Sequence, residues 1–406
     1  MRNFTLSVLA LFCMLGTSGM AQSPNLKTRL ATVREKVTAT RVAQSVVGHR
    51  LLDETPTADQ LVMRLTTSKQ VGDTIRLSID ADSESRVVGA MLVGEVGEDD
   101  YAPYKLEAQT VEVRGDVFLF GCAGNALTQI DLSGNPTLQG MDVSNNNLTQ
   151  LDLSHTPNFL ALMANDNQLV AVDLSVLPDL AVVGLNDNPL TALDVTRNEH
   201  LNMLFASGGK LKSLDLSNNF MLQVLEVNDN QLEALDVSTN FYLDELSCAR
   251  NQIAALDLTY QLALASLDCS GNGMTHLLLP SNPTLQSVVC HGNRLSKEQM
   301  HQLVEMLPDN NGEVSSPCPL VVFEPANPNE GNVMAEEDVA AANAKYWNVV
   351  TPSYQDYKGV TSIASAQLDA ADTTAYDLTG RPAAPTHRGV KIVKTPQGKA
   401  LKVLKP

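Results

Sequence analysis

A single period of 21 residues runs through the middle of the chain and constrains its fold more than any other feature. An apolar residue recurs at this interval at Ile130, Leu151, Val172, Leu193, Leu214, Leu235, Leu256 and Leu277. An Asp follows directly at positions 131, 152, 173, 194, 215, 236 and 257. No insertion or deletion interrupts the period, so these residues hold equivalent places in successive structural units.

A second column at the same period is asparagine. It comprises Asn125, Asn146, Asn167, Asn188, Asn230, Asn251, Asn272 and Asn293, and Gly209 is its one exception. One unit reads Leu222-x-x-Leu225-x-Val227-x-x-Asn230-x-Leu232, which resembles the leucine-rich repeat. The resemblance covers residues 117–297, and the 21-residue length is similar to that of internalin-like bacterial surface proteins. It implies a solenoid of stacked coils.

Side-chain alternation supports the same fold. In a strand, alternate side chains face the same way, so Leu225 and Val227 point inward together while Val224 and Glu226 point outward. One coil cannot bury its apolar face alone, and stacked coils share a core. We expect about nine parallel strands, which span roughly 40 Å at about 4.8 Å per strand.

Two inward columns are predicted to be structural. The Asn amides of Asn146, Asn167, Asn188, Asn230, Asn251, Asn272 and Asn293 are expected to bond backbone groups in the turn after each strand. The second column contains Cys122, Cys248, Cys269 and Cys290, in line with Val227. Packing as small buried hydrophobes is the favoured interpretation, because free Cys fills that role well. A disulfide would need strain at this strand spacing, and a straight column offers neither a tetrahedral metal cage nor an activating base.

The flanking segments differ from the array. Residues 22–116 begin with Leu26, Leu30, Val33 and Val37 at helical spacing, interleaved with Lys27, Arg29, Arg34, Lys36 and Arg41, and then become strand-like. Residues 298–350 contain helix and strand patterns, and Ser296 with Gln299 forms a capping box. The expected fold is therefore a β-rich α/β solenoid with an N-terminal β-rich cap and a C-terminal α/β cap, followed by a linker at 351–370.

Both ends of the chain look like targeting signals. Residues 1–21 have a charged start, a short apolar run and a small-residue cleavage site, which predicts a secretory signal peptide. The basic segment 371–406 resembles the C-terminal sorting domain of type IX secretion, in the order Tyr376-Asp-Leu-x-Gly380-Arg381, Gly389-Val-x-Ile392-Val and Lys402-Val-Leu-Lys405. A small strand pair that only completes the fold is the alternative. We expect a secreted or cell-surface protein without a membrane span.

Little in the sequence points to chemistry. The net charge of −18 argues against nucleic acid as a partner. No catalytic, cofactor or metal motif stands out, so no enzyme activity, cofactor or metal site is predicted. The Asp column could bind calcium, but the Ser or Thr two residues after each Asp favours local hydrogen bonds on a solvent-facing side.

The concave strand face is the candidate binding surface. Its outward positions do not repeat, and an apolar group with an acidic rim is expected to be exposed there: Met163, Val182, Met203, Phe205, Val224, Glu226 and Glu245. Exposed apolar patches of this kind mark protein interaction sites. We therefore expect a non-enzymatic adhesion or recognition protein that binds a host or bacterial surface protein. The alternative is a glycan-binding or enzymatic accessory protein with its site in a cap.

Overall fold

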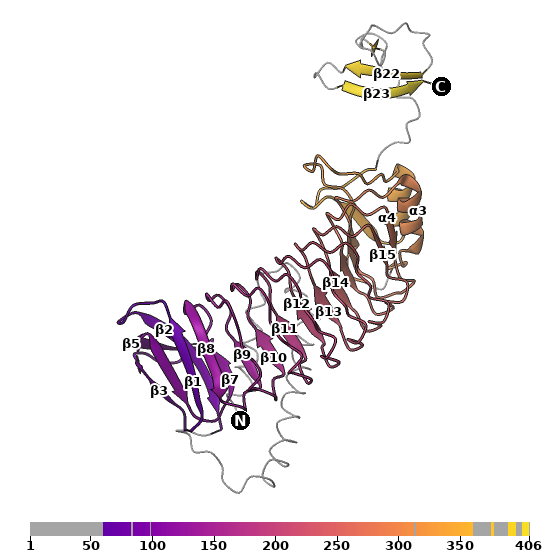
Figure 1. The fold of residues 1–406 in the computed structure, drawn as a ribbon. Coiled ribbons are helices and arrows are strands. Elements are labelled where there is room, and N and C mark those ends of the chain that lie inside the picture. The colour runs from indigo at the N-terminus through magenta and orange to yellow at the C-terminus, as the bar shows by residue number, and fades with distance from the viewer. Residues whose placement is uncertain are drawn as a thin grey trace. The chain divides into compact units, whose positions relative to one another are not determined.

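The computed structural model describes residues 60–82, 84–97, 99–311 and 314–359, and the backbone of three strands near the C-terminus. The chain forms two compact units, Met1–Lys358 and Gly359–Pro406 (Figure 1). The predicted signal peptide, the arm before residue 60 and residues 360–370 of the predicted linker lie outside the described residues. Each unit is considered separately below.

Within the described part of the first unit, nine parallel strands build the array, as predicted. They are β7 (Val117–Gly121), β9 (Gly140–Asp142), β10 (Ala161–Met163), β11 (Val182–Gly184), β12 (Met203–Phe205), β13 (Val224–Glu226), β14 (Glu245–Ser247), β16 (Ser266–Asp268) and β18 (Ser287–Val289). From β9 to β18 each residue pairs with the residue 21 positions further on, as Leu204 does with Leu225. The chain therefore folds as a leucine-rich repeat solenoid.

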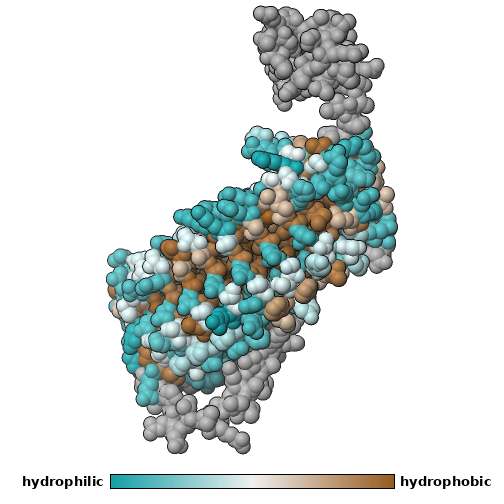
Figure 2. Space-filling view, turned by 45° about the vertical axis from the view of Figure 1, so that its right-hand side comes forward, coloured by the Kyte–Doolittle hydropathy of each residue, from teal (hydrophilic) through white to brown (hydrophobic). Residues whose placement is uncertain are grey.

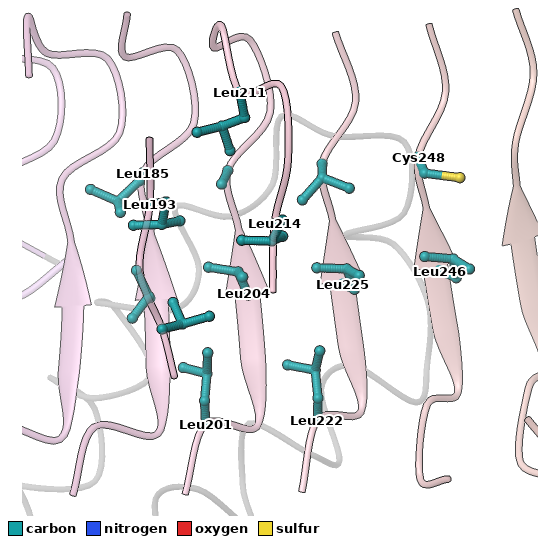
Figure 3. Close-up of a cluster of buried hydrophobic side chains, with 14 of the residues drawn as sticks. Leu185, Leu193, Leu201, Leu204, Leu211, Leu214, Leu222, Leu225, Leu246 and Cys248 are labelled. Carbon is teal, nitrogen blue, oxygen red and sulfur yellow. The ribbon is translucent and has the colours of Figure 1, made fainter. Parts of the chain in front are cut away.

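The core lies between the strands and the return segments of the coils. Figure 3 shows leucines of equivalent position stacked coil upon coil, with Leu201 beside Leu222 and Leu204 beside Leu225. These four side chains are fully buried in one cluster that runs through the array. Burial of one Leu contributes about 1.5–3 kcal/mol, so the repeated columns supply most of the driving force for folding.

A left-handed turn follows each strand of the array. Its residue has a positive φ in nine consecutive coils: Gly124, Asn145, Asp166, Asp187, Gly208, Asp229, Arg250, Gly271 and Gly292. Asn, Asp and Gly tolerate this conformation best, so the column suits the turn. Arg250 is the exception, and its side chain forms a bidentate ion pair with Asp229 on the preceding coil, at 2.6 Å for each contact.

The N-terminal region closes the first coil on two sides. It contains β1 (Val62–Thr67), β2 (Thr74–Ala81), β3 (Arg86–Val88), β4 (Ala90–Leu92), β5 (Ala102–Leu106), β6 (Thr110–Arg114) and β8 (Leu127–Gly134). Strand β2 pairs antiparallel with β7 on the strand side, and β1 pairs antiparallel with β8, the return segment of the first coil. Both β7 and β8 of the first coil are thereby paired, and the outermost strands at this end are β4 and β3.

The C-terminal region continues the array after the period ends. Helix α3 (Lys297–Met306) begins at the N-cap Ser296, whose hydroxyl accepts a hydrogen bond from the Gln299 N–H, as expected for a capping box. Strands β19 (Cys318–Val321) and β20 (Trp347–Val350) extend the parallel sheet beyond β18, and α4 (Glu336–Ala344) connects them. On the return side, β15 (Ala255–Asp257) pairs with β17 (His276–Leu278).

Two details of this region bear on the sequence analysis. Trp347 is a core residue, as expected, and its indole N–H donates to the Pro308 carbonyl at 2.9 Å. Tyr357 stacks on Phe323 with ring centroids 5.1 Å apart, so residues 351–358, assigned to a linker above, pack on the first unit. The connection between the two units therefore starts later than the sequence suggested.

The second unit contains a small antiparallel sheet in its described part. Its strands are β21 (Ala375–Tyr376), β22 (Gly389–Lys394) and β23 (Ala400–Lys405), in that order. Strands β22 and β23 contain the second and third motifs of the resemblance to a sorting domain, and β21 ends at Tyr376, the first residue of the first motif. Of the described helices, none has the length and apolar character that crossing a lipid bilayer demands.

Candidate protein-binding face

The strands of the array separate two sets of apolar side chains. The middle residue of each three-residue strand, such as Leu204 or Leu225, belongs to the core cluster. The first and third residues, such as Met203, Phe205 and Val224, belong to a second cluster that is separate from the core. The predicted division into inward and outward positions is therefore confirmed.

The candidate apolar residues gather as expected. Met163, Val182, Met203, Phe205 and Val224 form one cluster together with Phe118, Leu119, Leu160 and Ala161. In-register pairing brings this about, because it places Val182 beside Met203 and Met203 beside Val224. The cluster thus draws on the consecutive strands β10 to β13, with β7 at its N-terminal end. We call it the outward cluster.

The expectation that these side chains are exposed is wrong. Met163 is 2% exposed, Phe205 4%, and both Val182 and Met203 are 0% exposed. The adjacent carboxylates Glu226 and Glu245 are also buried, at 5% and 3%. Strand alternation fixes the side of the sheet on which a residue lies, but it does not determine what covers that side.

A glycine makes room within the outward cluster. Gly184 pairs with Met163 in the adjacent strand, and a Cβ added at Gly184 would lie 2.5 Å from the Met163 sulfur. Met163 therefore occupies the space that a side chain at position 184 would need. An unbranched thioether adapts to such irregular space more easily than a branched side chain does.

The polar residues at the edge of this face include carboxylates that accept hydrogen bonds. The Ser207 hydroxyl donates to Glu226 Oε1 at 3.2 Å and in turn accepts from the Asn228 N–H at 3.0 Å. At the N-terminal end, Asp142 is buried and accepts from the Tyr101 hydroxyl at 3.3 Å. Burial raises the pKa of the Asp142 carboxyl, because the charged form loses water.

Further negative charge follows the left-handed turns at the carboxyl ends of the strands. Asp166, Asp187 and Asp229 lie on this column. Partial burial and the charges of Asp166 and Asp229 raise the pKa of Asp187. A shift of this kind means that the carboxylates repel one another, and a cationic group nearby would relieve the repulsion.

The Asp column lies on the exposed return side of the coils. Each Asp accepts a hydrogen bond from the backbone N–H two residues on, as Asp215 does from Ser217 at 2.9 Å and Asp194 from Thr196 at 2.9 Å. These bonds lower the pKa of Asp215, where the backbone bond is the largest cause. The local hydrogen-bond interpretation is confirmed. Within the described residues, no group of three or more His, Cys, Asp or Glu side chains is arranged to hold a metal ion.

The Asn and Cys columns lie in the interior, as predicted. Asn230 Nδ2 donates to the carbonyls of Ala206, Val227 and Asn228, and its Oδ1 accepts from the Leu211 N–H at 3.0 Å. The same pattern recurs at Asn146, Asn167, Asn188, Asn251, Asn272 and Asn293. Cys122, Cys248, Cys269 and Cys290 are free and fully buried, and burial raises the pKa of each thiol.

Sequence reasoning missed a second amide ladder. Asn198, Asn219 and Asn240 are buried on the turns that lead into the strands, and Gln261 continues their column. Asn219 Nδ2 donates to the Val195 and Asn198 carbonyls, both at 2.9 Å. The signal was present in the sequence as a third column at the 21-residue period.

Sequence reasoning also missed an exposed apolar ridge. Its residues are Phe220, Met221, Phe241, Tyr242, Tyr260 and Leu262, all between 39% and 62% exposed. Phe220, Phe241 and Leu262 again stand 21 residues apart, on three consecutive coils. Figure 2 shows that hydrophobic residues gather in a band along the array, with hydrophilic residues on both sides. The array therefore carries apolar surface outside its core.

Comparison with known proteins does not assign the chain to a family. No protein-family model matches it, and no curated protein matches it. An internalin from Listeria monocytogenes is similar at 22% identity over 43% of this chain and 47% of that chain, with a TM-score of 0.35. A leucine-rich repeat protein from Leptospira interrogans is similar at 19% identity over 54% and 61% of the two chains, with a TM-score of 0.40.

A third structure is the functional domain of InlJ from Listeria monocytogenes, which includes a cysteine ladder. It is 17% identical over 73% of this chain and 92% of that chain, with a TM-score of 0.25. The present chain spans about half of the internalin and 61% of the Leptospira protein. Because all three TM-scores are below 0.5, the fold assignment rests on the strand order, register and core of the chain itself.

Proposed function

We propose that this chain is an exported, non-enzymatic recognition protein that binds a protein partner with its concave strand face. The observation that supports this proposal is the outward cluster. It places Val182, Met203 and Val224 on the consecutive strands β11 to β13, with Phe205 on β12 and with Glu226 and Glu245 on β13 and β14. A large aromatic surrounded by smaller apolar side chains is the usual composition of an interface centre.

The partner chemistry follows from the same residues. The carboxylates at the edge of the outward cluster are acceptors, and charge-assisted hydrogen bonds from Lys or Arg to a carboxylate are stronger than neutral ones. The neighbouring turns add Asp166 and Asp187, whereas Asp229 on the same column pairs with Arg250. A partner segment with apolar side chains on one side and basic side chains along its margin fits this face. The candidate sources are proteins of host or bacterial surfaces.

Three variants test this surface with proteins captured from host-cell and bacterial surface extracts. Phe205→Ala removes the central ring and should weaken binding of the captured protein at least tenfold in surface plasmon resonance, because truncated anchors cost about 2 kcal/mol or more. Glu226→Lys should mainly slow association, because charges at an interface steer the encounter. Asp215→Ala is the control, since Asp215 lies on the exposed return side.

The outcome discriminates between the two sides of the array. Binding that depends on Phe205 and not on Asp215 supports the concave face. Loss of binding with Asp215→Ala and full binding with Phe205→Ala would place the function on the return side. Thermal unfolding of each variant, followed by circular dichroism, checks that the array remains folded.

Export is the second part of the proposal. The sequence of residues 1–21 supports a signal peptide, and the order of motifs in 371–406 supports a sorting tail. Deletion of 371–406 should leave the array folded and hold the protein in the periplasm of the producing cell. Cell fractionation and surface labelling measure this. Normal surface display of the shortened chain would contradict the sorting interpretation.

A further inference from the structure

The long sheet of the first unit, which contains the strands of the array, ends differently at its two sides. Beyond β20 the chain turns back on itself. The Tyr357 N–H donates to the Val349 carbonyl at 2.9 Å, and Val350 forms an antiparallel bridge with Asp356. At the other end, the outermost of the described strands is β4, which pairs with β5 alone. Within the described residues, the chain's own backbone covers one end of the sheet and leaves the other as an open edge.

The backbone of β4 presents hydrogen-bonding groups at this edge. The Val93 N–H donates to the Pro103 carbonyl at 3.0 Å, across the pair of β4 and β5. Bonded and non-bonded positions alternate along antiparallel strands, so the N–H and C=O groups of Ala90 and Leu92 point away from β5. In the described part of the chain, no hydrogen bond reaches the backbone of either residue. Both residues can therefore pair with a further strand.

The side chains of this edge are apolar and uncharged. Met91 is 53% exposed, Leu92 55% and Val93 47%. Residues 87–94 contain no charged residue and no Pro. Natural proteins usually protect an exposed edge strand with Lys, Pro, a bulge or a covering segment. Among the described residues, β4 has none of these protections, which is typical of an edge that pairs with another strand.

Two copies of β4 satisfy each other's backbone groups when they pair antiparallel about Met91. In that register, Ala90 of one copy lies opposite Leu92 of the other, and the residues of each such pair exchange both N–H···O bonds. The outward groups lie symmetrically on the two sides of Met91, so none of them is left without a partner. Because residues 87–94 are uncharged, no like charges face each other across the pair. A second copy of this chain therefore fits the edge.

We propose that β4 is a dimerisation edge, at which two copies of this chain join their sheets around a two-fold axis through Met91. The interface is isologous, because both copies use the same strand. The bonded pairs of Ala90 with Leu92 and the apolar side chains of Met91, Leu92 and Val93 hold it together. This inference does not depend on the proposed function. A dimer carries two concave faces, which strengthens binding to any partner that presents repeated sites.

Sedimentation equilibrium of the purified chain measures the association. We expect a reversible equilibrium of monomer and dimer at concentrations of about 1–100 μM, since one short strand pair buries little surface. Met91→Lys places like charges opposite each other at the axis and should raise the dissociation constant of the dimer at least tenfold. Met221→Lys adds the same charge at another exposed Met and is the matched control, which should leave the constant unchanged.

A mixture of opposite charges tests the register. Met91→Glu alone should weaken the dimer as Met91→Lys does. An equal mixture of the two variants should regain the association of the unaltered chain, because opposite charges then meet at the axis. Failure of the mixture to associate would overturn the pairing about Met91, even if each variant alone is monomeric. Thermal unfolding followed by circular dichroism checks that both variants are folded.

Hydrogen exchange distinguishes a second copy from other occupants of the edge. A peptide that contains Ala90 and Leu92 should gain protection as the concentration of the chain rises. Protection in a monomer at every concentration would mean that another segment of the same chain covers the edge. A monomer without protection would mean that the edge does not bind a second copy. Either result overturns the proposal, and so does a dimer that Met221→Lys weakens and Met91→Lys does not.

Discussion

The Asn ladder offers the sharpest test of how the array is held together. Asn230→Ala removes one buried amide and leaves the apolar core unchanged. Asn230 is the partner that the structure gives to the Ala206 carbonyl and to the Leu211 N–H, at 2.8 and 3.0 Å. Both of these backbone groups belong to fully or nearly buried residues. The substitution therefore leaves an acceptor and a donor unsatisfied inside the solenoid.

The expected loss of stability follows from these two groups. A buried polar group without a partner costs about 1–3 kcal/mol, which gives roughly 2–6 kcal/mol for the pair. Relaxation of the turn recovers part of this loss, so we expect about 2–4 kcal/mol. The matched control is Asn218→Ala, which removes one exposed hydrogen bond to the Thr196 carbonyl and should change stability by less than about 0.5 kcal/mol.

Urea unfolding measured by circular dichroism and by Trp347 fluorescence provides the assay. Trp347 is the single Trp and reports the C-terminal region, whereas circular dichroism reports the whole array. Coinciding transitions justify a two-state analysis, and separated transitions would show that the coils near Asn230 unfold independently. An Asn230→Ala midpoint equal to that of Asn218→Ala would refute the assigned role of the ladder.

Three further predictions concern single sites and the thiols. Gly209→Asn should destabilise the array by about 1 kcal/mol or more in urea unfolding, because an added Cβ lies 2.7 Å from Asn230 Oδ1; a stabilised variant would contradict this. The hydrogen bond and charge of Asp338 raise the pKa of His301, so this pairing stabilises below the ordinary His pKa of about 6.5 and is lost as pH rises through the raised value. NMR titration should show the raised value, and Asp338→Asn should return it to the ordinary range. The four column thiols should resist alkylation in the folded chain and all react after unfolding without reductant; any thiol that stays unreactive would reveal a disulfide.

The repeated columns could be predicted because the chain can be aligned with itself. Each inward Leu, each ladder Asn and each buried Cys recurs at one position of the coil, and strand alternation then gives its direction. Even the left-handed turn is visible in the sequence as a column of Asn, Asp and Gly that includes Asp187 and Gly208. Propensity and period agree at these positions, which is the condition under which sequence reasoning succeeds.

Other features lie beyond a periodic analysis. The burial of Phe205 depends on what lies above the sheet, and nothing within the repeat specifies that. The antiparallel pairing of β1 with β8 joins residues about 65 positions apart, such as Leu65 and Ile130. No local sequence pattern therefore predicts it. The ladder through Asn219 was missed because Thr156 and Leu177 interrupt its column of amides, although its spacing is regular.

The outward cluster stands apart from every column that the solenoid requires. Inward Leu residues build the core, ladder Asn residues satisfy turn carbonyls, and Asp residues on the return side accept local N–H bonds. An outward strand position has none of these structural roles. The first residue of the strand is Ser266 on β16 and Ser287 on β18. The same position is apolar on the consecutive strands β10 to β13. Because the fold does not demand apolar side chains there, their presence supports the proposal that this face makes contact with a partner.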